Sequence, residues 1–96
     1  MNIAAFKESL AKIHPPDNMI QPLLALWYEA KGDWHKAHEI AKEIDNTTLG
    51  ALIHAYLHRK KGEHTNASYW YQQTGNKVYS KSFEEEWHML FESCTQ

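Results

Sequence analysis

Cysteine, proline and glycine are scarce in this sequence of 96 residues, with one, three and four copies respectively. The single cysteine, Cys94, cannot form an intramolecular disulfide, which is typical of a reducing compartment, and we expect a cytoplasmic location. The glycines do not cluster, and the sequence has neither a glycine-rich phosphate-binding loop nor a Gly-x-Ser-x-Gly nucleophile motif. These absences argue against nucleophilic catalysis and favour a protein that is not an enzyme, with an enzymatic site in the second half of the chain as the alternative.

Long apolar runs and an excess of basic residues are also missing. No segment approaches the ~18 apolar residues of a membrane-spanning helix, and Lys7, Glu8 and Lys12 interrupt the region where a signal peptide needs an apolar core. The formal net charge is -2 and the pI is near 6.4. Nucleic-acid-binding proteins draw their affinity from a basic surface. We therefore expect neither a membrane nor a nucleic acid as a partner.

The apolar and aromatic content is high enough for a packed globule. Hydrophobic residues make up 43% of the chain and aromatic residues 12%. A chain of this length buries roughly 60–65% of the surface that its unfolded form exposes, which leaves no room for a second core. We therefore expect residues 1–96 to form a single domain.

Apolar residues recur at three- and four-residue spacing along most of the chain, which predicts helices. We expect six, over residues 2–13, 18–31, 34–44, 48–61, 64–73 and 82–93. Asp33 and Ser82 are suitable N-caps, and either Asp17 or Asn18 could cap the second helix, with Pro22 in its first turn. Residues 77–81 indicate a loop or a short extended piece. The predicted fold class is all-α, with short turns and no strand.

Two segments of this chain are similar when they are set thirty residues apart, namely Leu23–Ala37 and Ile53–Ala67. Each reads as an apolar helix, a glycine followed by an acid, and a second helix. The matching positions are Ala25 with Ala55, Lys31 with Lys61, Gly32 with Gly62, and Ala37 with Ala67. Glycine at the turn provides a left-handed residue that ends the first helix of each pair, and the small alanines would let the paired helices approach closely.

This pattern resembles tetratricopeptide repeats over residues 20–74. The first copy carries the residues Ala25, Tyr28, Gly32, Asp33, Trp34 and Ala37. The second copy carries Ala55, Gly62, Ala67 and Tyr71, whereas His58 and His64 stand where the family has aromatic residues. The period of thirty is shorter than the ~34 residues of the family. The resemblance implies two antiparallel helix pairs, with the helices at 2–13 and 82–93 as caps on either side.

The same resemblance implies a protein-interaction module, which is our leading functional hypothesis. In such domains the first helix of each pair lines a peptide-binding groove. The corresponding residues here are Leu26, Glu29, Tyr56, Arg59 and Lys60. Tyr and Arg are strong interface anchors. We therefore expect a protein or peptide partner.

The segment HRKKGEHTNASYWYQQTG also resembles a pattern found in uncharacterised bacterial proteins. The resemblance lies in its His-Arg, Gly-acid, Asn-Ala, Tyr-Trp-Tyr and Gly elements. It implies a bacterial protein and names no reaction.

A cluster of polar and aromatic residues in the second repeat offers an alternative function. Its members are Arg59, Lys60, Glu63, Asn66, Tyr69, Trp70 and Gln73. As a site, the cluster would bind a small anionic or sugar-like ligand through cationic, amide and aromatic contacts. If these residues have only a structural role, Tyr69 and Trp70 would pack against the last helix and Arg59 would pair with a carboxylate.

Histidines provide a further alternative, a metal site. His54 and His58 are four residues apart, so their rings share one helix face, a spacing that can hold Zn²⁺ or a similar ion. The third ligand would come from elsewhere, with Glu63, His64, Glu85 and His88 as options. The structural interpretation is a pair of half-buried histidines that bond to the backbone or to a neighbouring side chain. His35 and His38, by contrast, look solvent-facing.

A homodimer formed through the last helix is a third possibility. Its apolar stripe consists of Trp87, Leu90 and Phe91. If that stripe were exposed, it could form a contact between two copies of the chain. If it were buried, it would close one end of the repeat.

Overall fold

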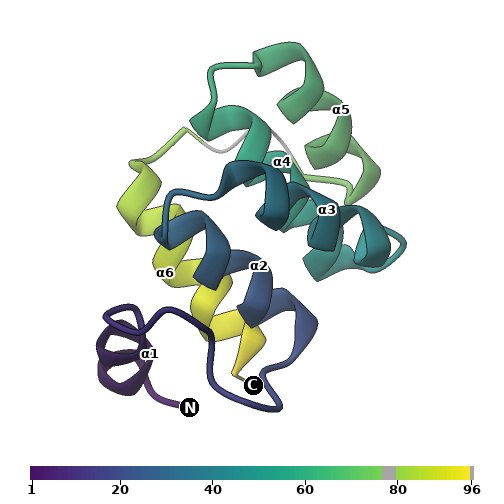
Figure 1. Cartoon of the computed structure of the whole chain (residues 1–96). Coiled ribbons are helices and arrows are strands. Elements are labelled where there is room, and N and C mark those ends of the chain that lie inside the picture. The colour runs from purple at the N-terminus through teal and green to yellow at the C-terminus, as the bar shows by residue number, and fades with distance from the viewer. Residues whose placement is uncertain (77–79, 96) are drawn as a thin grey trace.

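The computed structural model describes residues 1–76 and 80–95 (Figure 1). Its helices are α1 (Ile3–Ser9), α2 (Gln21–Ala30), α3 (Trp34–Ile44), α4 (Thr48–Lys60), α5 (His64–Gln73) and α6 (Phe83–Cys94). The described residues contain no strand, so the predicted all-α class with about six helices is confirmed. The loop predicted at 77–81 lies mostly outside the described residues. None of the helices in the described part is long and apolar enough to cross a membrane.

Two helical hairpins, α2–α3 and α4–α5, turn at the glycines that the repeat predicts. Gly32 has φ +86° and Gly62 has φ +81°, a conformation that strains any residue with a β-carbon. The amide of Asp33 donates to the carbonyl oxygen of Tyr28 at 2.9 Å, and the amide of Glu63 donates to that of His58 at the same distance. Both turns therefore have the hydrogen-bond pattern of a Schellman C-cap.

Small residues allow the helices to pack closely. The alanines that the repeat aligns have no exposed surface, namely Ala25, Ala37, Ala55 and Ala67. Helix α3 also packs against α4, so the two hairpins lie side by side (Figure 1). At their junction, a β-carbon on Gly50 would lie 1.9 Å from the carbonyl oxygen of Ile44. Any larger residue at position 50 would have to push α3 and α4 apart.

Helix α6 packs against α2 and α4, and α1 lies beside it at the N-terminal end of the chain (Figure 1). The ring of Phe6 in α1 lies 5.3 Å from that of Phe91 and 5.6 Å from that of Trp87. Leu90 is fully buried. Both terminal helices therefore complete the main core, and most of the apolar stripe of α6 faces the inside of its own domain.

Helix α1 is shorter than the predicted range 2–13 and spans seven residues. Ile13, expected on its apolar face, is 85% exposed. The ammonium group of Lys31 donates to the carbonyl oxygens of Leu10 and Lys12 at 2.7 and 2.9 Å. These carbonyl groups bind the side chain of the residue that caps the end of α2 instead of continuing the helix, a tertiary contact that helical periodicity does not reveal.

Helix α2 starts three residues later than the predicted range 18–31. Its N-cap is Ile20, which makes no side-chain cap, so the expected cap by Asp17 or Asn18 is wrong. Asn18 has φ +63° and belongs to the preceding turn. Pro22 lies in the first turn of α2, as predicted, where its missing N–H costs least.

Candidate functional site

Helix α4 is the central element of the fold, and it carries candidate residues on two opposite faces. It contacts α2, α3, α5 and α6. Tyr56 and Lys60 share one face, and His54 and His58 share another, because residues four apart lie one above the other on a helix. A shift of two residues rotates a side chain by about 200°. The two pairs therefore belong to separate sites.

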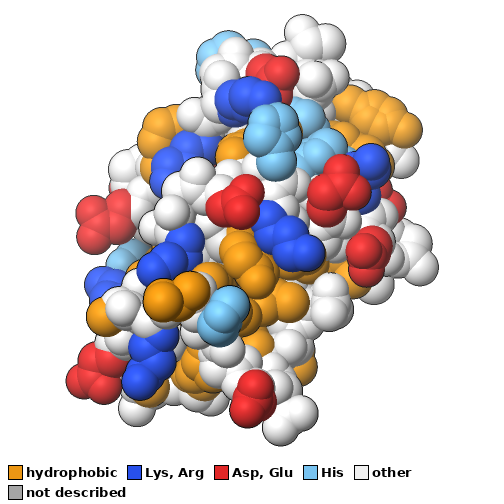
Figure 2. Space-filling model, viewed as in Figure 1, with side chains coloured by type: hydrophobic (Ala, Val, Ile, Leu, Met, Phe, Trp, Pro, Cys, Tyr) orange, Lys and Arg blue, Asp and Glu red, His pale blue; other side chains and the backbone are white. Residues whose placement is uncertain are grey.

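The first site is a cavity of about 550 Å³ between α1, α2, α4 and α6. Its apolar lining includes Leu10, Tyr56, Phe83 and Trp87. Its charged lining is Lys7, Glu29, Lys60 and Glu84. On the face shown in Figure 2, hydrophobic side chains likewise lie among charged ones of both signs. This volume falls within the usual range of roughly 300–1,000 Å³ for ligand pockets.

An ion pair and a tyrosine join α2 to α4 within this cavity. Lys60 Nζ lies 2.6 Å from Glu29 Oε2, and the hydroxyl group of Tyr56 donates to Glu29 Oε1 at 3.4 Å. Tyr56 is 1% exposed, and this burial, together with the Glu29 charge, raises the pKa of its hydroxyl group. The Tyr56 hydroxyl therefore stays protonated and available as a donor at neutral pH.

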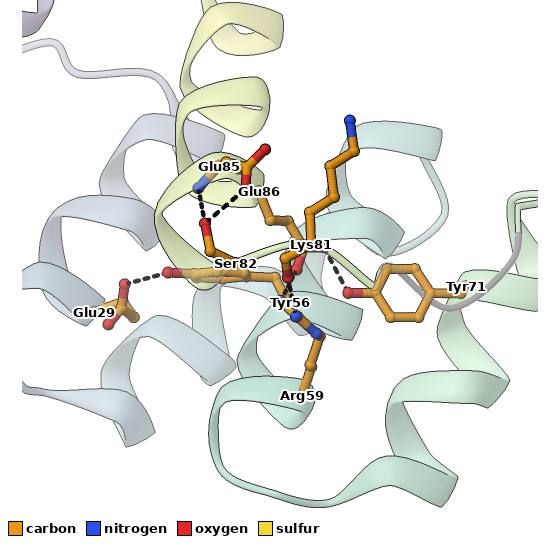
Figure 3. A network of polar contacts seen from close by, with 8 residues as sticks. All are labelled: Glu29, Tyr56, Arg59, Tyr71, Lys81, Ser82, Glu85 and Glu86. Atoms are coloured by element: carbon orange, nitrogen blue, oxygen red, sulfur yellow. Dashed lines mark hydrogen bonds and ion pairs between the residues drawn. The ribbon is translucent and has the colours of Figure 1, made fainter.

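A second polar network fixes α6 to the same helix (Figure 3). Glu86 is completely buried, which raises the pKa of its carboxyl group, while a hydrogen bond from Tyr71 and the charge of Arg59 act in the opposite direction. Arg59 Nη1 lies 2.9 Å from Glu86 Oε1, and the hydroxyl group of Tyr71 donates to Oε2 at 2.5 Å. Arg59 also donates to the carbonyl oxygen of Lys81. The Arg59 guanidinium is thus engaged within the domain.

On the opposite face of α4, three imidazole rings converge. His38 from α3 joins His54 and His58, and each ring offers one nitrogen within 4.8 Å of those of the other two. His38 Nε2 lies 3.0 Å from His54 Nε2. Histidine side chains gather on the face shown in Figure 2, next to acidic and basic ones. Three convergent imidazole nitrogens are a donor set that a transition-metal ion can use.

Carboxylates and indoles surround these three rings. Glu63 Oε1 is 3.0 Å from His58 Nδ1, and Asp45 Oδ2 is 3.5 Å from His54 Nδ1. The ring of Trp70 stacks on His54 with 4.1 Å between centroids, and that of Trp34 stacks on His38 with 4.7 Å between centroids. Burial lowers the pKa of His54 to about 4, so this ring is neutral at pH 7.

The polar and aromatic residues of the second repeat do not converge on one site. Trp70 lies against His54 and lines a separate cavity of about 250 Å³ with Gln73. Tyr69 is half exposed and Asn66 is exposed. Arg59 instead contacts Glu86 and the ring of Phe83. The residues proposed as one ligand site therefore lie in different surroundings.

Two residues of the histidine site were missed or misplaced by the sequence. His38 was expected to face solvent but is partly buried in the cluster, and Glu63, considered as a third ligand, contacts His58 Nδ1. A signal was present, because Trp34, His38 and Ala41 fall at the spacing of one helix face. The pairing of α3 with α4, which makes that face an inner one, is a long-range contact.

Comparisons with protein-family models, curated proteins and solved structures give no match for this chain.

Proposed function

We propose that this domain is a protein-interaction module and that the cavity between α1, α2, α4 and α6 binds a peptide segment of a partner protein. The observation that carries this proposal is the open cavity itself, which combines an aromatic lining with charged side chains from four helices. The repeat of two hairpins with matching turns supports the tetratricopeptide-like architecture proposed for the chain. Helix α6 covers part of the face that the first helices of the two hairpins share.

The chemistry of the cavity favours an apolar side chain next to an acidic one. Phe83 and Trp87 provide aromatic surface for an apolar anchor. A neighbouring cavity of about 240 Å³ shares Glu29 and Lys60 with the first and adds Lys61. Three lysines and two glutamates line the two cavities, namely Lys7, Lys60, Lys61, Glu29 and Glu84. Their side chains together carry one net positive charge at neutral pH. An acidic flanking residue on the partner would match that excess.

The small-ligand alternative receives less support from the same residues. It relied on Arg59, Asn66 and Trp70 acting together, and these residues lie in different environments. The homodimer through α6 also receives less support, because Leu90 and Phe91 are 0% and 5% exposed and Trp87 is partly buried. The apolar surface that remains available on α6 includes Phe83, which is 42% exposed.

Selection of peptides by display on the immobilised domain would test this proposal. We expect the selected peptides to share an apolar residue beside an acid and to shift the indole resonance of Trp87. Lys60→Met, which removes the charge and keeps the aliphatic stem, should weaken their binding about tenfold, equivalent to about 1.4 kcal/mol. Lys42→Met is the matched control, because Lys42 also lies near a glutamate, Glu39, but on α3. Equal binding to both variants, or shifts confined to another surface, would refute the proposal.

A further inference from the structure

The three imidazole rings at the α3–α4 junction have nearly the spacing that a metal ion requires. Two nitrogens bound to one Zn²⁺ in a tetrahedral site lie about 3.4 Å apart, as follows from Zn–N bonds of about 2.0–2.1 Å. His38 Nε2 and His54 Nε2 are 3.0 Å apart, and the nitrogen of His58 completes a triangle with no side longer than 4.8 Å. Small side-chain rotations would therefore convert this cluster into a three-nitrogen site.

The carboxylates next to two of these rings favour the tautomer that carries the proton on Nδ1 and leaves the lone pair on Nε2. A carboxylate only accepts hydrogen bonds, so Glu63, at 3.0 Å, places the proton of His58 on Nδ1. Asp45, at 3.5 Å, favours the same tautomer of His54 electrostatically. His54 then presents its Nε2 lone pair to His38 in the cluster, and the lone pair of the neutral His58 ring lies on Nε2. Metal-binding histidines are commonly oriented in this way by a carboxylate on the other ring nitrogen.

His54 is buried without a complete set of partners. It is 4% exposed, and its Nδ1 makes no hydrogen bond despite the nearby carboxylate. Its Nε2, by contrast, shares a hydrogen bond with another imidazole, that of His38. A buried polar group in this condition costs free energy, which a bound cation would offset through the Nε2 lone pair and by strengthening the attraction between Nδ1–H and Asp45.

The surrounding residues hold the rings in place and restrict access to them. Trp70 and Trp34 stack on His54 and His38, which limits rotation of both rings. His58 is 8% exposed, whereas His38 is only partly buried. Solvent therefore reaches the cluster on the side of His38, where a water molecule can supply a fourth ligand.

We propose that His38, His54 and His58 form a binding site for a divalent transition-metal ion, with water as the fourth ligand. Imidazole nitrogens suit Zn²⁺, Cu²⁺, Ni²⁺ and Fe²⁺, and the cluster lacks the thiolates that would favour softer ions. Because His38 belongs to the first hairpin and the other two to the second, a bound ion links the hairpins directly. This site is independent of the peptide cavity on the opposite face of α4.

Titration of the untagged, metal-free domain with ZnCl₂ in a calorimeter tests the site. We expect saturable binding of one ion per chain and a rise in melting temperature. His38→Ala and His38→Gln should weaken binding at least ~100-fold, since loss of an outer-shell partner alone costs about 10–100-fold. Glu63→Gln should show that smaller loss. His35→Ala is the matched control, because His35 is an exposed histidine on the same helix.

Co²⁺ provides a second readout that needs no variant to fold. In the wild-type chain we expect the visible absorption of a four-coordinate Co²⁺ ion, which Zn²⁺ should displace. The proposal is overturned if the wild-type chain shows no stoichiometric binding, if folded His38 variants bind Zn²⁺ as tightly as the wild type, or if His35→Ala lowers affinity equally.

Discussion

His54 has the most constrained ionisation behaviour among the histidines at the α3–α4 junction. Its ring is buried, and its Nε2 lies 3.0 Å from Nε2 of a second imidazole, His38. Protonation would place a cation in a desolvated position beside two further imidazoles, and these causes depress its pKa to about 4, with Asp45 opposing them weakly. At the scale of the residue, His54 therefore couples stability to pH.

The metal-free domain should lose stability as the pH falls from 7. The unfolded chain has a His54 pKa near 6.5 and the folded chain one of about 4, so the unfolded state binds the proton first. The contribution of His54 is complete above pH 6.5 and is lost between that value and about 4, for a total of about 3 kcal/mol. Burial lowers the pKa of His38 as well, which adds to the loss in the same direction.

Urea unfolding of the chelator-treated domain at pH 7 and pH 5 measures this loss. His54→Gln should show a smaller decrease between the two pH values than the wild type, whereas His35→Gln should show the same decrease. A wild-type free energy of unfolding that does not change between pH 7 and pH 5 would contradict the burial of His54 as a neutral ring.

Single residues also show where sequence reasoning succeeds and where it stops. Asp33 and Ser82 cap their helices as predicted, because a cap depends on the amides two or three positions ahead. Glu86 lies in the acidic first turn of α6, where its neighbours are exposed, yet it is completely buried. Its partners are Arg59 and Tyr71, more than ten residues away along the chain. Local patterns do not contain such a contact.

At the scale of the element, α6 is fixed by a buried charge as well as by apolar packing. Removal of Glu86 would leave the Arg59 cation, whose side chain is 13% exposed, without its carboxylate and Tyr71 without an acceptor at Glu86. Breaking a buried ion pair on one side typically costs about 3–5 kcal/mol. This cost should appear first as detachment of α6.

We expect Glu86→Ala to destabilise the domain by about 3–5 kcal/mol and to increase amide hydrogen exchange throughout α6. Glu92→Ala is the control, because Glu92 is an exposed acid of the same helix. Chemical denaturation and hydrogen exchange measure the two effects. A loss below about 1 kcal/mol, similar to that of the control, would show that the buried network does not hold α6.

The helices differ in how well their first and last residues can be predicted from the local sequence. The turns at Gly32 and Gly62 were predicted because a glycine that follows an apolar helix commonly ends that helix in the left-handed conformation. The end of α1 was not predicted, since it depends on Lys31, which binds two carbonyl groups of the preceding segment. Helix starts and ends set by local caps are therefore recoverable, and those set by tertiary contacts are not.

At the scale of the whole molecule, the stacking of the two hairpins creates the histidine cluster, of which the sequence alone predicted only the two members on α4. Four-residue spacing placed His54 and His58 on one face of α4. Only the packing of α3 on α4 brings in His38, sixteen positions before His54. The same packing turns the opposite face of α4 toward α2 and α6, where Tyr56 lines the cavity. One helix thus serves two sites.

The most direct measurement of this arrangement is a long-range ¹H–¹⁵N correlation spectrum of the histidine rings in the metal-free domain at neutral pH. Stacked hairpins predict a neutral His54 with the proton on Nδ1, facing Asp45, and an unprotonated Nε2 toward His38. A His54 ring that carries its proton on Nε2, or that titrates near pH 6.5 as a freely exposed histidine does, would contradict the placement of the two hairpins.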